Sequence, residues 1–258
     1  MINPLVIKLG GNILEKEIAL NGLFKTLSNY LKIYNRAIII VHGGGCIIDN
    51  LMNKLSLTTT KKNGLRITNT DQIDIVIAAL AGIANKKLLS WAKKFKINSI
   101  GLCLSDGNIV DAIQINKELG HVGCVIPGKQ LLLRILFDNG YMPIISSIGI
   151  DDHGCLLNVN ADEAATAIAL TVEGNLILLS DVNGILDKKG NLIKVLNTNE
   201  AEKLIANNTI SNGMAIKTRA ALKAARNLNY PVYIASWQQT DQLIDLFNGS
   251  LVGTKVFA

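Results

Sequence analysis

The chain is poor in several features that mark common protein classes. Aromatic side chains make up only 5% of its 258 residues, and the lysines that dominate the formal charge of +6 are spread along the chain. Proteins that read nucleic acids usually cluster basic residues on one face and interleave aromatic ones that stack on bases. We therefore expect no nucleic-acid partner.

Metal clusters and membrane segments are not indicated either. The four cysteines form no C-x-x-C pair and have no histidine at zinc-site spacing, and no apolar run reaches 18 residues. The first 14 residues carry Lys8 within an apolar run, with no basic leader and no small-residue cleavage site. We expect reduced thiols, no bound metal cluster, no membrane partner and a location in the cytoplasm.

Hydrophobic residues are abundant, at 49% of the chain, and their pattern alternates between strand and helix signals. Two runs, Leu5–Leu9 and Ala37–Val41, are rich in branched residues and end at glycines, and 17–33 between them has helical spacing. A hairpin is expected over 58–68 around Asn63-Gly64, and a second around 187–191. Further helices are expected over 47–55, 71–95, 129–139, 161–171, 199–206, 214–228 and 240–247, and further strands over 99–102, 109–114, 121–125, 143–148, 176–180, 232–235 and 254–257.

This alternation predicts an α/β fold, an open α/β/α sandwich with a mainly parallel central sheet. The length suits one large domain or two closely fused lobes. We place the boundary after the helix at 161–171, giving an N-terminal lobe of residues 1–172 and a C-terminal lobe of 173–258. Ligands of such sheets bind at the carboxyl ends of the strands.

Two of the expected strands end directly in glycines, at Gly10-Gly11 and at Gly43-Gly44-Gly45. Backbone N–H groups in such loops can approach an anion, and the helix that follows Gly45 adds a favourable dipole. The spacing fits neither the dinucleotide fingerprint, because Ile48 stands where the third glycine would be, nor a phosphate-binding P-loop. Either loop alone is equally explained by a tight turn.

Lys8 and Asp162 are charged residues at telling positions. A lysine inside an apolar strand must leave the core or meet a negative charge, and an edge strand with a solvated ammonium is the alternative. Asn160 is expected to cap the helix at 161–171. Asp162 then lies in the first turn of that helix, where complementing the helix dipole would be reason enough for its presence.

Five motifs occur in order along the chain, and together they are far more specific than any one of them. With these motifs the chain resembles the N-acetylglutamate kinases of the amino acid kinase family, over residues 1–258 and with no departure at the motif positions. The motifs are Lys8-Leu9-Gly10-Gly11, His42-Gly43-Gly44-Gly45, Lys62-Asn63-Gly64-Leu65-Arg66, Asn158-Val159-Asn160-Ala161-Asp162 and Gly213-Met214 to Lys217.

The resemblance implies an enzyme that phosphorylates the side-chain carboxylate of N-acetyl-L-glutamate with ATP and Mg²⁺ in arginine biosynthesis. The first lobe would bind the acylated amino acid and the second ATP. Lys8 and Lys217 would be catalytic, with Asp162 holding both lysines in place. The implied substrate-binding residues are Gly11, Gly44, Gly45, Arg66, Asn158 and Asn160, and the implied ATP-binding residues are Lys8, Gly10, Gly11, Asp181, Val182, Asn183, Gly184, Ile185, Leu186, Thr209, Ile210, Ser211 and Lys217.

Three points stay open at the level of sequence. A sibling kinase acting on another acid such as N-acetylaminoadipate, and a catalytically silent nucleotide-binding regulator, are the alternative functions. No carboxylate in the sequence stands out as a ligand of Mg²⁺, which often rests on phosphate oxygens and waters. Family members inhibited by arginine carry an extra N-terminal helix, whereas this chain reaches its first strand at once, so we expect a homodimer that is insensitive to arginine.

Overall fold

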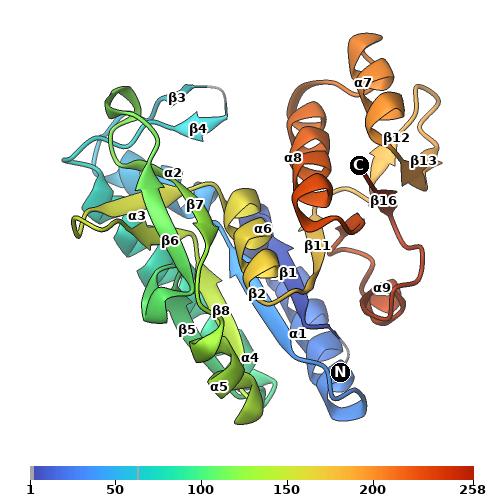
Figure 1. Ribbon diagram of the computed structural model, residues 1–258, viewed down its shortest axis with the longest axis horizontal. Coiled ribbons are helices and arrows are strands. Elements are labelled where there is room, and N and C mark those ends of the chain that lie inside the picture. The colour runs from blue at the N-terminus through green and yellow to red at the C-terminus, as the bar shows by residue number, and fades with distance from the viewer. Residues whose placement is uncertain (1–2, 63) are drawn as a thin grey trace.

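The computed structural model describes residues 3–62 and 64–258, and the fold described below refers to that part of the chain. Its main feature is an eight-stranded sheet (Figure 1). All neighbouring strands run parallel except the pair formed by residues 232–236 and 254–256. The spatial order is β14 (Val195–Leu196), β16 (Thr254–Val256), β15 (Val232–Ser236), β11 (Asn175–Ser180), β1 (Leu5–Leu9), β2 (Ile38–His42), β8 (Met142–Ser146) and β5 (Ser99–Cys103).

Helices cover both faces of this sheet, which confirms the predicted three-layer α/β/α arrangement. Successive residues of a strand point to opposite faces, so Val6 packs into one hydrophobic cluster while Leu5 and Ile7 pack into the other. The first cluster is completed by α5 (Leu131–Asp138), α6 (Ala161–Thr171) and α8 (Asn212–Leu228), and the second by α1 (Glu17–Ile33), α4 (Asn85–Lys94) and α9 (Leu243–Phe247).

The long helix expected over 71–95 is one continuous helical segment with an irregular middle. It consists of α3 (Ile73–Ile77), the π-helical η2 (Ala78–Ala84) and α4. Gly82 lies inside η2. This segment packs against α2 (Gly45–Lys54) in a third, smaller cluster of buried residues.

A second sheet of four strands lies beside the first, in the order β6 (Val110–Gln114), β7 (Val122–Pro127), β10 (Leu156–Val159) and β9 (Ile148–Ile150). The single strand expected over 143–148 is wrong: it divides at Ser147 between β8 of the main sheet and β9 of the second sheet. The sequence analysis also missed β10 and β14. All of these depend on pairing partners that lie far away in the chain.

The remaining elements are short. The hairpin expected over 58–68 contains β3 (Lys61–Lys62) and β4 (Leu65–Arg66), and Asn63 at its expected turn lies outside the described residues. The second hairpin joins β12 (Ile185–Leu186) to β13 (Leu192–Ile193). The others are α7 (Thr198–Ala206), η1 (Gly11–Glu15), η3 (Asp106–Asn108), η4 (Lys117–Leu119) and η5 (Thr240–Gln242).

The connections of the sheet diverge at its centre. The chain leaves β1 through α1 on one face to reach β2, whereas it enters β11, the other neighbour of β1, through α6 on the opposite face. At such a switch point the loops after the two strands turn apart and open a crevice at their carboxyl ends. The crevice is thus expected between Gly10-Gly11 after β1 and Asp181 after β11.

Candidate active site

Lys8 points from β1 toward α6 because it shares the strand face of Val6. Its Nζ lies 2.8 Å from Oδ1 of Asp162 in the first turn of α6, and the two side chains are only 15% and 22% exposed. The structure therefore confirms that this lysine meets a negative charge instead of extending from an edge strand. An ion pair of this kind, largely out of water, fixes both side chains at the carboxyl end of β1.

Asn160 caps α6, as the sequence predicts. Its Oδ1 accepts from the backbone N–H of Asp162 at 2.8 Å and of Glu163 at 3.3 Å. The cap sets where the first turn begins and so where the Asp162 carboxylate stands. One turn of helix thereby positions the partner of Lys8.

Lys217 approaches from the other side, on α8 beyond β11. Its Nζ donates to Ser180 Oγ at 2.5 Å and lies 3.2 Å from Asp181 Oδ1. The expectation that Asp162 holds both lysines is met for Lys8 alone, since within the described residues the ion-pair partner of Lys217 is Asp181. α8 packs against α6 and β15, and Lys217 on it reaches Ser180 and Asp181 at the end of β11.

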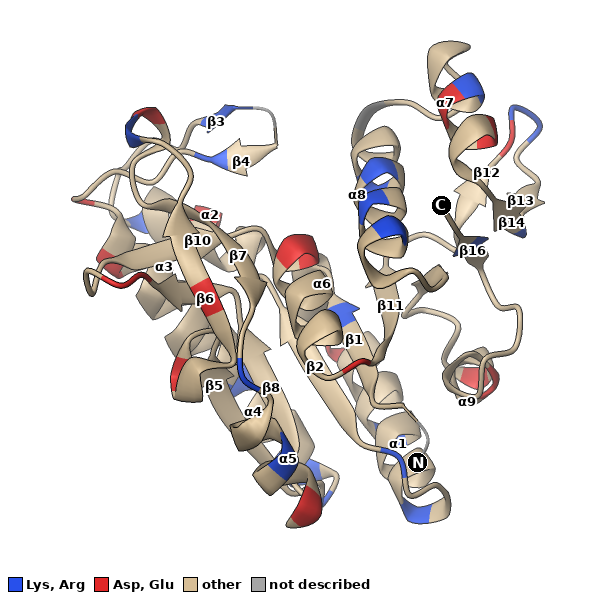
Figure 2. Cartoon of the chain, viewed as in Figure 1, with Lys and Arg blue, Asp and Glu red and all other residues tan. Residues whose placement is uncertain are grey.

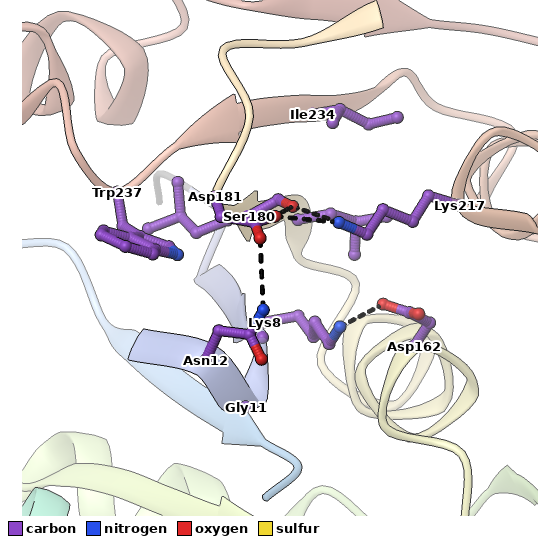
Figure 3. A pocket seen from close by; sticks show the side chains of 12 residues that line it. Lys8, Gly11, Asn12, Asp162, Ser180, Asp181, Lys217, Ile234 and Trp237 are labelled. Carbon is purple, nitrogen blue, oxygen red and sulfur yellow. Dashed lines mark hydrogen bonds and ion pairs between the residues drawn. The ribbon is translucent and has the colours of Figure 1, made fainter. Parts of the chain in front are cut away.

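Both lysines line one cavity of about 210 Å³, at the switch point of the sheet. Figure 3 shows them entering it from opposite sides, Lys8 with Asp162 and Lys217 with Ser180 and Asp181. Cations from the two halves of the chain therefore converge on one space. The other lining residues are Gly10, Gly11, Asn12, Leu178, Leu179, Ile234 and Trp237.

Asp181 is the most strongly perturbed carboxylate of the cavity. Partial burial raises its pKa, but hydrogen bonds from Ser180 and Lys217, the charge of Lys217 and a hydrogen bond from Asn12 outweigh burial and lower the pKa to about 2. Asn12 Nδ2 donates to its Oδ2 at 3.2 Å, across the switch point. Asp181 thus stays ionised at neutral pH and joins the loop after β1 to α8.

The two glycine loops touch each other beside this cavity. A Cβ on Gly11 would lie 3.0 Å from the backbone N of Gly45 and 3.4 Å from Cα of Gly44. A Cβ on Gly44 would lie 2.8 Å from Leu80 of η2. The backbones of the two loops therefore approach closely at Gly11, whereas at Gly44 a side chain would have to displace Leu80. The N-cap of α2 is Gly44, and no side-chain hydrogen bond caps this helix.

His42 contacts the backbone of the second glycine loop at Gly43. It is fully buried, and its Nδ1 faces the carbonyl oxygen of Gly43 at 2.8 Å while its Nε2 faces Asn85 Nδ2 at 3.1 Å. A carbonyl can only accept and an amide nitrogen can only donate, so Nδ1 carries the proton and Nε2 accepts. Burial lowers the pKa of His42 to about 4, against the opposing effect of the Gly43 bond.

Arg66 and Asn158 do not line the 210 Å³ cavity but lie on the side of α2 and the second sheet. Arg66 is 8% exposed, its Nη2 lies 2.5 Å from Asp49 Oδ1 and donates to Gly45 O at 3.5 Å, and its Nη1 is buried with no partner among the described residues. The contact with Asp49 is a misaligned ion pair, because the Asp49 oxygen accepts no hydrogen bond. Asn158 Nδ2 donates to Thr68 Oγ1 at 3.1 Å.

The two segments expected to contact a nucleotide lie next to Lys217 or its helix, one beginning at Asp181 and the other ending at the N-cap of α8. The segment 181–186 leads from β11 into β12 through Gly184, whose φ of +146° and close neighbour Thr254 leave no room for a side chain. The segment 209–211 precedes α8, with Ile210 buried and Ser211 at the N-cap without a side-chain bond. Both segments flank the helix that carries Lys217.

Two residues of the site were missed at the level of sequence. Asn12 and Trp237 line the cavity without having been selected. Asn12 adjoins a selected residue at the end of a parallel strand, which is a usable signal. Trp237 follows β15 and carries no comparable local pattern.

Residues 3–62 and 64–258 contain no cluster of three or more His, Cys, Asp or Glu side chains suited to a metal ion. None of the helices described there combines the length and apolar character needed to cross a bilayer. In Figure 2 lysine and arginine are mixed with acidic residues over both halves of the chain.

A mainly parallel sheet that brings glycine amides and two lysines to its carboxyl edge is typical of α/β proteins that bind phosphorylated ligands. The family model described as "Amino acid kinase family" matches residues 3–236. The chain belongs to the amino acid kinase family.

Curated relatives at 56–57% identity are named "Acetylglutamate kinase". The relative from Buchnera aphidicola subsp. Acyrthosiphon pisum (strain 5A) is 57% identical over 256 residues, covering 99% of this chain and 100% of the relative. The relative from Photorhabdus laumondii is 56% identical over 257 residues, covering 100% of both. A crystal structure of a Streptococcus mutans UA159 protein superposes with a TM-score of 0.84 at 27% identity over 100% of both chains.

Proposed function

We propose that this chain transfers the γ-phosphoryl group of ATP to the side-chain carboxylate of N-acetyl-L-glutamate, giving N-acetyl-L-glutamyl 5-phosphate and ADP in arginine biosynthesis. The observation that carries the proposal is the convergence of Lys8 and Lys217 on one cavity at the carboxyl edge of the sheet. The names of full-length relatives at 57% and 56% identity supply the substrate.

The acceptor needs no general base. A glutamate-like carboxyl has a pKa of about 4.3, so its oxygen is already a nucleophile near neutral pH. That oxygen forms a bond to the γ-phosphorus while the bond to the bridging β–γ oxygen breaks, and ADP leaves with the electron pair. Asp162, already bound to Lys8, is therefore an organiser.

The acceptor carboxylate and ATP are both anions and repel each other, and positive groups of the chain reduce this repulsion. Lys8 from one half and Lys217 from the other neutralise charge on the transferring phosphoryl group and on the leaving oxygen. The backbone N–H groups of Gly11, Gly44 and Gly45 add donors that need no reorganisation. The partners of the lysines, Asp162 and Asp181, hold the ammonium groups in place before substrates arrive.

Arg66 and Asn158 are proposed to grip the carboxylate of N-acetyl-L-glutamate that does not react. The buried, unpartnered Nη1 of Arg66 supports this, because such a donor is costly unless a ligand completes it. The Oδ1 of Asn160 caps α6, so its side-chain NH₂ group is the part proposed to contribute to the substrate site. Asp49 beside Arg66 balances part of the charge.

ATP is proposed to lie along 181–186 and 209–211, with its phosphates toward Gly10, Gly11 and the two lysines. The two carboxylates of the cavity are each paired with a lysine, so they do not form a ready Mg²⁺ site. We propose that Mg²⁺ is carried on phosphate oxygens and waters.

The test is ADP production in a coupled assay, with N-acetyl-L-glutamate as acceptor. Lys8→Ala and Lys217→Ala should each lower kcat by about 10²- to 10³-fold with the fold retained. Lys223→Ala is the matched control, because Lys223 lies on the same helix as Lys217 but pairs with Glu163 on the outside of α6. Turnover near the wild-type value in both active-site variants would exclude the proposed roles.

Two other functions are separated by the same assay. A preference for N-acetylaminoadipate, one methylene longer, corresponds to a discrimination of only about 1–3 kcal/mol in an apolar pocket, so both acids must be compared. A silent nucleotide-binding regulator would release no ADP in response to either acid. The paired lysines Lys8 and Lys217 in one cavity favour catalysis over that reading.

Four further points stay predictions: the division into lobes 1–172 and 173–258, the homodimer, insensitivity to arginine and a location in the cytoplasm. The dimer is supported by β5, whose outer edge has no strand beside it in the described sheet, since open edges favour pairing with another chain. Light scattering should give twice the mass of 27.8 kDa. A hexamer, or strong inhibition by arginine, would contradict the predicted subtype.

A further inference from the structure

Thr68 occupies a junction between the β3–β4 hairpin and the second sheet. It is fully buried, and its backbone donates to Leu119 O at 3.1 Å and accepts from the N–H of His121 at 2.7 Å. It forms an isolated parallel bridge with Gly120. A Cβ on Gly120 would lie 2.2 Å from the Thr68 oxygen, so glycine with its φ of +66° is required for this approach. The backbone of Thr68 is therefore fixed on both sides.

The hydroxyl of Thr68 has two partners. It donates a hydrogen bond to the carbonyl oxygen of Arg66 at 3.0 Å and accepts one from Nδ2 of Asn158 at 3.1 Å. A hydroxyl has one hydrogen, and a carbonyl can only accept, so the hydrogen is committed to Arg66. The atom of Asn158 that faces Thr68 must then be a donor, which fixes the orientation of the Asn158 amide.

This arrangement prepares both residues for an anion. With one hydrogen of Nδ2 bound to Thr68, the second hydrogen of the Asn158 amide stays available for an acceptor. The backbone of Arg66 is held by the same hydroxyl, while its Nη1 is buried and has no partner in the part of the chain that the structure describes. A single side chain thus joins a strand of the second sheet to the arginine of the hairpin.

We propose that Thr68 is a positioning residue that sets Arg66 and Asn158 as one unit for binding the carboxylate of the acceptor. The inference rests on the proposed function and deepens it, because it adds a residue that touches neither ATP nor the transferring phosphoryl group. It predicts a specific defect in acceptor binding. If Thr68 served only packing, its substitution would lower stability and would not affect KM for N-acetyl-L-glutamate more than KM for ATP.

The experiment compares two substitutions at Thr68 with one at Thr171. Thr68→Val keeps the shape and removes the hydroxyl, and Thr68→Ser keeps the hydroxyl. Thr171→Val is the matched control, since Thr171 is also buried and its hydroxyl bonds the carbonyl oxygens of Ile109 and Ala167, away from the proposed acceptor site. KM for N-acetyl-L-glutamate and for ATP, kcat and the thermal midpoint are measured for each.

Thr68→Val should raise KM for N-acetyl-L-glutamate about three- to tenfold, the range expected for one hydrogen bond, and leave KM for ATP within about twofold. Thr68→Ser should restore the wild-type KM, and Thr171→Val should leave both KM values unchanged. If Thr68→Val does not fold, Thr68→Ala, which also lacks the hydroxyl, replaces it. Calorimetric binding of N-acetyl-L-glutamate should weaken by the same factor.

The outcomes separate this inference from the proposed function. An active wild type with an unchanged acceptor KM in Thr68→Val, or with equal changes for both substrates, would overturn the role of Thr68 alone. A wild type that neither binds nor phosphorylates N-acetyl-L-glutamate would overturn the proposed function, and the role of Thr68 with it.

Discussion

Acidification to pH 5 should destabilise this protein through His42. The imidazole is fully buried at the end of β2, and burial lowers its pKa from 6.5 to about 4 despite the bond to the Gly43 oxygen. A second proton would place a charge in the core and turn Nε2 into a donor facing the Asn85 amide nitrogen. The folded state therefore resists protonation, whereas the unfolded chain does not.

The size and sign of the effect follow from linkage. Well above pH 6.5 the imidazole is neutral in both states, so the stability contribution is fully present. As the pH falls from 6.5 toward 4, the unfolded state binds the proton first and folding loses stability. Each tenfold difference in proton affinity is worth about 1.4 kcal/mol, so the free energy of unfolding should fall by about 2 kcal/mol at pH 5 and about 3 kcal/mol below pH 4.

The assay is urea unfolding at pH 7.5 and pH 5 for the wild type and His42→Asn. Asparagine keeps a donor for the Gly43 oxygen and does not titrate, so the variant should be less stable at pH 7.5 but lose about 2 kcal/mol less on acidification. The exposed His153, changed to Asn, controls for loss of a surface imidazole. Equal pH dependence of the wild type and His42→Asn would refute the reasoning.

Two other perturbations test the site and its support. Arg66→Ala should raise KM for N-acetyl-L-glutamate about 10- to 100-fold with little change in kcat, because it removes charged donors from a carboxylate. Arg219→Ala, at an exposed arginine paired with Glu202, is the control. An unchanged KM in Arg66→Ala would remove Arg66 from the site. Gly101→Ala should lower the free energy of unfolding by about 1–3 kcal/mol, because its Cβ would lie 2.0 Å from Asn85 Oδ1 and displace the partner of His42. Gly82→Ala is the control and should be tolerated, because a Cβ there meets no atom within 4 Å. Equal urea midpoints for the two variants would contradict the role of Asn85.

Elements with local signals were predicted closely from the sequence. The helix expected over 17–33 is α1 to the residue, and the helix after Asn160 is α6, because a cap and a run of helical spacing are properties of the segment itself. The strand expected over 143–148 was wrong for the opposite reason. Nothing local says that the chain changes from β8 to β9 at Ser147, since each half is a strand only in relation to a distant partner.

The site shows the same division. The position of Lys8 in an apolar strand left two possibilities, a solvated edge or a meeting with a negative charge, and the family motifs were enough to select Asp162 and Lys217. The partner of Lys217 was not predictable. Its contact with Ser180 and Asp181 depends on how α8 packs against α6 and β15, which is set by core packing of residues far apart in the chain.

By itself, then, the sequence determined the alternation of strands and helices, the glycine loops and the two lysines, because propensity, capping and side-chain period are local. Only the tertiary structure decided that both lysines share a cavity, that His42 is neutral between Gly43 and Asn85, and that Thr68 joins Arg66 to Asn158. Burial and hydrogen-bond partners belong to the packed molecule, since they arise where segments separated by many residues meet.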